Sequence, residues 1–304
     1  MSSAALVREA AVRIQPLARR TPVLEAEVDG IQLFLKCENL QRGGSFKIRG
    51  ASNLILSLTP EELGRGIVAF SSGNHAQGVA LAARYAGAKA TVVMPTDAPR
   101  SKMEATRAYG ATVVTYDRVR ENREEIARKL LQDSSATLVP PFDHPLIVAG
   151  QGTAALELLE EVPDLEAIVT CLGGGGLTAG CALIAKDINP AIEIFGVEPE
   201  TGNDWYLSLQ KGERVEIPPP PTIADGLRTV IPGKIPFPIL QELLTEVLLV
   251  TDDELRLAMR FLLENVKIVA EPSGAASTAG VLSGKLPKRF GRVGVIVSGG
   301  NLDF

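Results

Sequence analysis

The chain has 304 residues, of which 45% are hydrophobic and 22% charged, and its formal net charge is −5. This composition is ordinary for a globular protein, and the length suffices for one large or two modest α/β domains. The negative charge and the absence of a basic stripe argue against nucleic-acid binding. No apolar run reaches the roughly 18 residues that a membrane span needs. We therefore expect neither a nucleic acid nor a membrane as a partner.

The N-terminus and the cysteines indicate the compartment. The first twenty residues lack the apolar core of a secretory signal and are typical of a short amphipathic helix. Cys37, Cys171 and Cys181 are an odd number at wide spacing, so they predict neither a disulfide framework nor a zinc site. The expected location is a reducing cytoplasm.

Short apolar runs alternate with helical patterns along the chain. A first series has expected strands at 31–37, 67–70, 90–94, 112–116 and 137–139, and expected helices at 50–58, 76–85, 101–109 and 120–132. A second series has expected strands at 167–171, 192–197 and 292–297, and expected helices at 153–161, 177–187, 252–264 and 274–282. This alternation predicts two α/β units with parallel sheets and helices on both faces.

Three glycine-containing loops follow expected strands, where open parallel sheets bind ligands. The most informative contains Gly173, Gly174, Gly175 and Gly176, which leave one strand and open a helix. Without side chains, several backbone N–H groups can converge on one anion, and the helix dipole adds to the attraction. We interpret this loop as a phosphate cradle; a flexible turn and a dinucleotide loop are the alternatives.

The other two loops carry polar groups. Lys47 follows a Gly-Gly turn at an expected helix start, where the dipole and desolvation would lower the pKa of its amine and make it nucleophilic. The alternative is an exposed surface lysine. Residues 71–78, SSGNHAQG, could bind a cofactor ring and a carboxylate, or could simply form a helix N-cap and turn.

The loops occur with other motifs in a specific order. The stretches SFKIRGA, SSGNHAQG, AGQGTAALE, GGGGLTAG, GVEPE, TIADGL, EPSGAAS and SGGN run from about residue 21 to the C-terminus. In this order they resemble the fold-type II enzymes that use pyridoxal 5′-phosphate (PLP), specifically the serine/threonine dehydratase and serine racemase family. The resemblance implies two open parallel-sheet α/β domains of the tryptophan synthase β-like type, with the active site in the cleft between them. It places residues 1–45 and 143–304 in a large PLP-binding domain and residues 46–142 in a small domain.

The resemblance also implies which residues hold the cofactor. Lys47 would carry PLP as a Schiff base, Phe46 would pack on its ring, and Asn74 would bind the ring hydroxyl. The four glycines from 173 to 176, with Leu177, would hold the phosphate. Ser298 would contact the pyridine nitrogen. A neutral hydroxyl there makes the cofactor a weaker electron sink than a carboxylate would, which favours rapid elimination over transamination.

Substrate and reaction are implied in the same way. Ser71, Ser72 and Gly73 would bind the carboxylate of a small amino acid, and Lys47 would act as general base. Ser72 would also permit proton delivery to the opposite face, as in racemases. Arg123 aligns with an arginine that can reach the substrate and could pair with a second carboxylate. A solvated arginine on a charged helix is its alternative interpretation.

A metal site and an activity complete the expectation. In metal-dependent members, positions equivalent to Glu198, the Gly202 carbonyl and Asp204 bind Mg²⁺, and oxygen ligands suit Mg²⁺, Mn²⁺ or Ca²⁺. We expect a homodimeric ammonia-lyase that converts serine or threonine to a 2-oxo acid and ammonia. A 3-hydroxyaspartate dehydratase, a serine racemase and a non-catalytic PLP-binding module are the alternatives.

Overall fold

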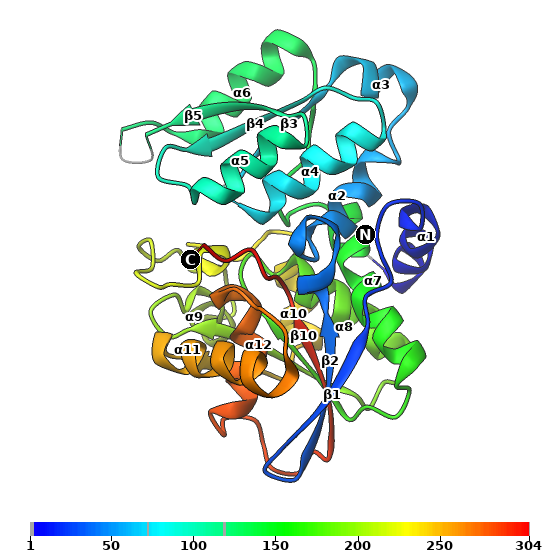
Figure 1. Ribbon diagram of the computed structural model, residues 1–304, viewed down its shortest axis with the longest axis vertical. Helices are drawn as coiled ribbons and strands as arrows, with labels where there is room; N and C mark the ends of the chain where they lie inside the picture. The colour runs from blue at the N-terminus through cyan, green and yellow to red at the C-terminus, as the bar shows by residue number, and fades with distance from the viewer. Residues whose placement is uncertain (1–2, 72, 118–119, 304) are drawn as a thin grey trace.

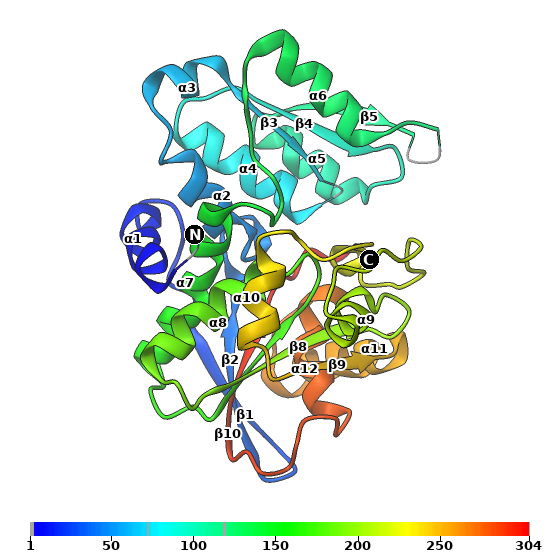
Figure 2. The ribbon, with the colours of Figure 1, turned by 180° about the vertical axis from the view of Figure 1, so that it is seen from behind.

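The computed structural model describes residues 3–71, 73–117 and 120–303. These residues form two lobes that follow one another along the long axis of the molecule (Figure 1), and each lobe is built on its own sheet. The view from behind shows the same division (Figure 2). Two α/β units were expected, and the two sheets confirm them.

The larger sheet has six strands in the order β1-β2-β10-β7-β8-β9. Strand β1 is antiparallel to β2, and the remaining pairs are parallel. The strands are β1 (Val23–Val28), β2 (Ile31–Cys37), β7 (Ala167–Cys171), β8 (Glu193–Pro199), β9 (Glu246–Val250) and β10 (Arg292–Val297). The central strands β7 and β10 are almost entirely buried because helices cover both faces.

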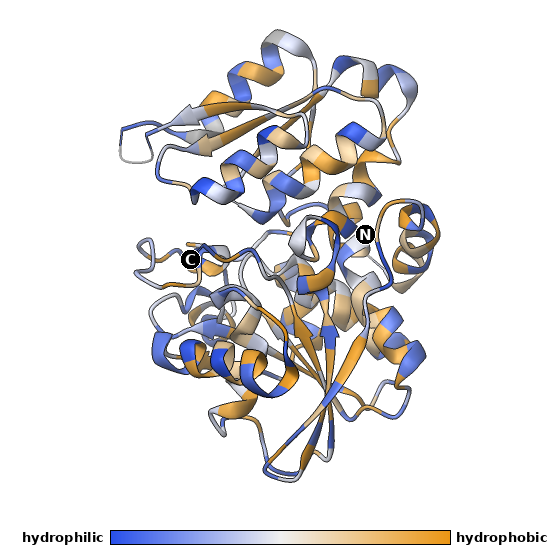
Figure 3. Ribbon diagram, in the orientation of Figure 1, coloured by the Kyte–Doolittle hydropathy of each residue, from blue (hydrophilic) through white to orange (hydrophobic). Residues whose placement is uncertain are grey.

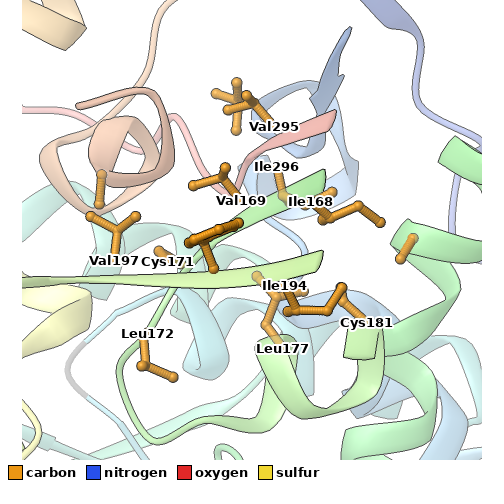
Figure 4. Packing of buried hydrophobic residues seen from close by; sticks show 14 of the residues in the cluster. Ile168, Val169, Cys171, Leu172, Leu177, Cys181, Ile194, Val197, Val295 and Ile296 are labelled. Atoms are coloured by element: carbon orange, nitrogen blue, oxygen red, sulfur yellow. The ribbon is translucent and has the colours of Figure 1, made fainter. Parts of the chain in front are cut away.

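Helices of the larger lobe pack on this sheet from two sides. Helix α12 lies against β7 and β10, and α7 and α8 pack together on the opposite face (Figure 4). Apolar side chains such as Val169, Ile194 and Val295 fill the space between these layers. The helices are α1 (Ala4–Ile14), α7 (Pro145–Glu161), α8 (Gly176–Ile188), α9 (Asp204–Lys211), α10 (Pro236–Leu243), α11 (Asp252–Phe261) and α12 (Pro272–Leu282).

The smaller sheet has four parallel strands in the order β5-β4-β3-β6. The strands are β3 (Ile67–Phe70), β4 (Ala90–Pro95), β5 (Thr112–Tyr116) and β6 (Thr137–Leu138). The helices of this lobe are α2 (Lys47–Ile55), α3 (Pro60–Arg65), α4 (Asn74–Tyr85), α5 (Arg100–Ala108) and α6 (Arg123–Ser134). All strands of this sheet lie inside residues 46–142, but the domain boundaries at 45/46 and 142/143 stay a proposal.

Helix α2 connects the lobes because it packs against both α4 and α7. A Cβ on Gly150 would lie 2.6 Å from the Cα of Gly50, so the α2 and α7 backbones touch where both carry glycine. Beside this crossing, the fully buried Arg49 guanidinium forms hydrogen bonds and ion pairs with the carboxylates of Glu38 and Glu157. The carboxylates satisfy the buried charge, and they fix the start of α2 relative to the larger sheet.

The distribution of hydropathy follows the layers: the strands are mostly apolar, and polar residues gather on the outer faces of the helices (Figure 3). Among the described residues, no helix combines the length and the apolar character needed to cross a bilayer. All three cysteines are buried and unbridged, in agreement with the sequence.

Candidate active site

Lys47 is the first residue of α2, and its side chain reaches the segment between β6 and α7. Its amine donates a 3.0 Å hydrogen bond to the Pro141 carbonyl and lies 5.0 Å from the centre of the Phe46 ring. Burial lowers the pKa of this amine from 10.5 to about 8, because desolvation disfavours its charged form. At pH 7 roughly a tenth of this amine is therefore uncharged and nucleophilic, far more than for an ordinary lysine.

The chain brings Ser298 to Lys47 through backbone contacts. The Phe46 N–H donates to the Ser298 carbonyl at 3.1 Å, and Ser45 forms an antiparallel bridge with Gly299. The Ser298 hydroxyl is nearly buried; it donates to the Ser273 carbonyl and accepts from the Cys171 thiol, both at 3.3 Å. Ser298 therefore presents a neutral hydroxyl at the end of β10, close to the lysine-bearing turn.

The four glycines connect β7 to α8, and their geometry excludes side chains. An ideal Cβ on Gly174 would lie 2.2 Å from the Phe142 ring, and one on Gly175 would lie 2.2 Å from the Trp205 ring. Gly175 also has φ of 89°, which favours glycine. The loop thus offers bare backbone at a helix N-terminus, which fits the phosphate of PLP. The Leu177 side chain lies in the core (Figure 4), so Leu177 can contribute only its backbone.

The loop between β3 and α4 lies beside these groups. The Gly73 N–H donates to the Ser71 hydroxyl at 3.1 Å. Asn74 begins α4; its amide nitrogen donates to the Glu271 carboxylate, and its amide oxygen accepts from Asn301 at 2.9 Å. Asn74 therefore joins a network with groups of the larger lobe. Ser72, expected to bind substrate, lies outside the described residues.

A buried charge cluster stands at the same place, and the sequence patterns did not indicate it. The Lys102 ammonium lies 2.7 Å from the Asp225 carboxylate and 2.8 Å from that of Glu271. Burial alone would lower the Lys102 pKa, but the two carboxylates outweigh it and raise the pKa. A Cβ on Gly73 would lie 2.8 Å from the Lys102 side chain, so Lys102 also packs against the loop that is expected to bind the substrate carboxylate.

His75 is fully enclosed and has a structural role. One ring nitrogen lies 2.9 Å from the Val139 carbonyl oxygen. Burial, with the nearby Lys47, lowers the pKa of His75 to about 3. This pKa favours the neutral imidazole near neutral pH, and the Val139 contact holds the ring in place.

Glu198 and Asp204 lie buried at the end of β8 and the start of α9. The Glu198 carboxylate accepts the backbone N–H groups of Trp205 and Tyr206. Both Asp204 oxygens lack a well-formed hydrogen bond within the described part of the chain. Burial raises the pKa of Asp204 to about 7, and burial with the nearby Asp204 raises that of Glu198.

The chemistry of this acidic pair fits a divalent cation, because two adjacent buried carboxylates are costly unless a cation compensates them. Gly202, whose carbonyl was the third expected ligand, lies in the turn between them, where its N–H donates to the Pro199 carbonyl. Within the described ranges, no three His, Cys, Asp or Glu residues group into a metal cluster. The metal site therefore stays a proposal.

Arg123 begins helix α6, and the structure does not describe its side chain. The helix packs on β3 and β4 of the small sheet. The expected contact of Arg123 with substrate is therefore untested. Lys47, Asn74, Ser298 and the glycines come from four separate segments. Phe46 contacts Ser298, and Lys47 contacts Pro141, whose neighbour Phe142 would meet a Cβ on Gly174. Their roles toward the cofactor stay a proposal.

Comparisons with known proteins settle the family. Residues 14–299 match the family described as pyridoxal-phosphate dependent enzyme. The chain belongs to this family. It is 51% identical over 302 residues to an L-threo-3-hydroxyaspartate ammonia-lyase from a Pseudomonas species, covering 98% of this chain and 94% of the relative.

Two solved structures have the same fold. Maize serine racemase superposes with a TM-score of 0.97 at 40% identity, covering 100% of this chain and 94% of that one. Serine racemase of Dictyostelium discoideum superposes with a TM-score of 0.94 at 44% identity, covering 100% of this chain and 99% of that one. The fold-type II architecture and the dependence on PLP that the sequence predicts are confirmed.

Proposed function

We propose that this protein is a PLP-dependent ammonia-lyase that eliminates water from 3-hydroxyaspartate. The main observation behind this proposal is the buried Lys47 amine, whose pKa is about 8. The neutral Ser298 hydroxyl, Asn74 and the glycine loop without side chains support it. PLP, when bound, supplies an electron sink that makes the Cα proton of an attached amino acid removable. The residues around it decide which reaction follows.

Each of these residues has one task in the proposal. Backbone N–H groups of the glycine loop and of Leu177 hold the phosphate, Asn74 holds the ring hydroxyl, and Phe46 packs on the ring. Ser298 meets the pyridine nitrogen without a charge. Lys47 Nζ removes the Cα proton as a general base, which its lowered pKa suits. The proton taken up by Lys47 would balance the departure of the β-hydroxyl as water, and the unsaturated amine so formed would hydrolyse to a 2-oxo acid and ammonia.

The substrate assignment rests on the Pseudomonas relative, which is an L-threo-3-hydroxyaspartate ammonia-lyase. Compared with serine or threonine, this substrate has a second carboxylate that requires its own cation or donor set. Arg123 is the residue that we assign to it. Ser71, Ser72 and Gly73 bind the carboxylate that all these substrates share. The serine or threonine lyase that the sequence favoured is the second candidate.

A substrate panel tests this assignment. L-threo-3-hydroxyaspartate, L-serine and L-threonine are compared by kcat/KM, with release of ammonia as the readout. We expect hydroxyaspartate to be preferred, and Arg123→Ala to reduce only its turnover. Arg128→Ala, on an exposed position of the same helix, is the matched control. A preference for serine or threonine, or equal losses for all three substrates, would reject the assignment.

Racemisation on the same scaffold is the alternative that the maize structure favours. It needs a proton donor on the face opposite Lys47, and Ser72 is the residue that we assign to this task. Chiral analysis of the amino acid recovered from L-serine separates the two reactions. Formation of D-serine faster than that of ammonia would make racemisation the main activity, and Ser72→Ala would then remove it.

Other expectations also stay proposals: a homodimer, a cytoplasmic location, and a divalent cation at Glu198 and Asp204. Oxygen ligands of this kind suit Mg²⁺, Mn²⁺ or Ca²⁺. The pair lies behind the glycine loop, with Trp205 between them. A cation there would therefore have a structural or activating role.

A further inference from the structure

Trp205 is the only tryptophan of the chain and lies directly beneath the glycine loop. It is the second residue of α9, and its side chain is completely buried. The Phe237 ring packs on the indole with 6.0 Å between ring centres. None of the tasks in the proposed reaction belongs to this residue.

The indole makes two contacts with the loop. Its Nε1–H donates to the Gly173 carbonyl, and its ring abuts the backbone of Gly175. In a planar trans peptide, the C=O and N–H groups point in opposite directions. Fixing the Gly173 carbonyl toward Trp205 therefore directs the Gly174 N–H away from the indole, toward the side where an anion would bind.

The same residue touches the acidic pair. Its backbone N–H donates to Glu198 at 3.3 Å, and Asp204 immediately precedes it in the chain. A change in the position of Glu198 or Asp204 must therefore move the backbone that carries the indole. This residue thus links the acidic pair directly to the Gly173 carbonyl.

We propose that Trp205 is a positioning residue that holds the glycine loop in its phosphate-binding shape and couples that shape to a cation at Glu198 and Asp204. This inference rests on the proposed use of PLP and adds to it a link between two sites. Two consequences follow. Losing the indole N–H weakens binding of the phosphate group, and a cation strengthens that binding only when Trp205 is present.

The first test uses the cofactor-free protein and two ligands. Trp205→Phe keeps an aromatic ring but removes the donor to Gly173. We expect its dissociation constant for PLP to rise about 3- to 10-fold, the effect of one lost hydrogen bond. Binding of pyridoxal, which has the same ring and aldehyde without the phosphate, should not change. Phe237→Leu disturbs the other face of the indole without removing the donor, and should bind PLP like the wild type.

A merely structural role predicts a different pattern. If Trp205→Phe weakens pyridoxal as much as PLP, or weakens neither, Trp205 does not position the phosphate loop. Failure of the wild type to bind PLP would instead reject the proposed function itself. The two failures are therefore distinguishable in one experiment.

The second test measures the coupling through Trp205 fluorescence, which reports on one site because the chain has one tryptophan. Inorganic phosphate is titrated into the cofactor-free wild type, once with Mg²⁺ and once with a chelator. We expect a saturable change in emission and tighter phosphate binding with Mg²⁺. For Trp205→Phe, phosphate binding is measured by competition against PLP, and Mg²⁺ should no longer change the affinity for phosphate. Equal effects of Mg²⁺ on both proteins, or none on the wild type, would overturn the coupling.

Discussion

The Lys102 ammonium lies 2.8 Å from the Glu271 carboxylate, and this ion pair joins the two lobes beside the cofactor site. Lys102 belongs to α5 in the smaller lobe, whereas Glu271 precedes α12 in the larger one. Their side chains are only 3% and 1% exposed, so water screens the pair weakly. Glu271 also accepts a hydrogen bond from Asn74, which we assign to the cofactor ring.

Lys102→Met should therefore destabilise the protein and impair catalysis together. It leaves Glu271 and Asp225 without their shared cation, and breaking such a buried pair costs about 3 kcal/mol or more. Chemical denaturation measures the loss, and kcat/KM should fall because Glu271, which accepts from Asn74, is no longer held by Lys102. Adding Glu271→Gln should restore part of the stability. Arg100→Ala, which removes an exposed ion pair on the same helix, is the control and should leave stability unchanged. If Lys102→Met and Arg100→Ala changed stability equally, the role of Lys102 in joining the two lobes would be contradicted.

Gly174→Ala should weaken cofactor binding. The new Cβ would lie 2.2 Å from the Phe142 ring, so either the ring or the loop must shift. Overpacking of this kind costs about 1–3 kcal/mol, which corresponds to roughly a 5- to 150-fold loss of affinity for PLP. Phe142→Leu in the same chain should recover part of it. Gly64→Ala, where no atom lies within 4 Å of the new Cβ, is the control. An unchanged dissociation constant in Gly174→Ala would show that the loop does not bind the cofactor.

The rate of PLP uptake by the cofactor-free protein should depend on the Lys47 pKa. Only the neutral amine attacks the aldehyde, so the rate should rise with pH, reach half of its maximum near the pKa of about 8, and level off about one pH unit higher. An ordinary lysine would still be gaining rate near its pKa of 10.5. The rate of uptake is measured from the growth of the visible absorption band at pH values between about 6 and about 10. A rate that still climbs at the upper limit would show that burial does not lower this pKa, and Lys47→Ala should show no band at any pH.

Divalent cations should stabilise the wild type through Asp204. At a free concentration about one hundred times the dissociation constant, the gain in unfolding free energy is about 2.7 kcal/mol. Asp204→Asn should lose this response. In a chelator, however, it should be more stable than the wild type, because one of two adjacent buried carboxylates is gone. Thermal unfolding with Mg²⁺ and with a chelator measures both effects, and an equal response of the two proteins would reject the site.

The glycine loop could be interpreted from its own local pattern, whereas the roles expected of Lys47 and Ser298 came from the order of several motifs and the resemblance that this order carries. Four glycines between a strand and a helix already indicate bare backbone at an anion site. The cluster around Lys102 could not be found in this way. Lys102 and Glu271 are 169 residues apart, and neither segment has a local feature that indicates a partner.

The elements show the same contrast. Strand β2 has the expected bounds, Ile31–Cys37, and its apolar residues Leu33, Phe34 and Leu35 lie buried at its centre. The helix expected at 153–161 in fact begins at Pro145, so its first two turns were missed. Gly150 and Gly152 lower helix propensity there, but a Cβ on Gly152 would lie 2.5 Å from the Gly180 carbonyl oxygen. Close packing of α7 on α2 and α8 favours glycine at these positions, and this tertiary requirement is not visible locally.

Several elements were also absent from the expectation. They include β1 (Val23–Val28), α9 (Asp204–Lys211), α10 (Pro236–Leu243) and β9 (Glu246–Val250). The helix expected at 252–264 was only partly correct, since the α-helix ends at Phe261 and a π-helical turn, Leu262–Val266, follows. Trp205 lies in one of the missed helices, which is why its position beneath the loop could not be foreseen.

The most direct test of the whole account is to locate the covalent attachment of the cofactor. PLP-loaded protein is reduced with borohydride, digested, and analysed by mass spectrometry for the modified lysine. The account predicts the pyridoxyl group on Lys47. Its attachment to another lysine such as the buried Lys102, or to none, would contradict the account.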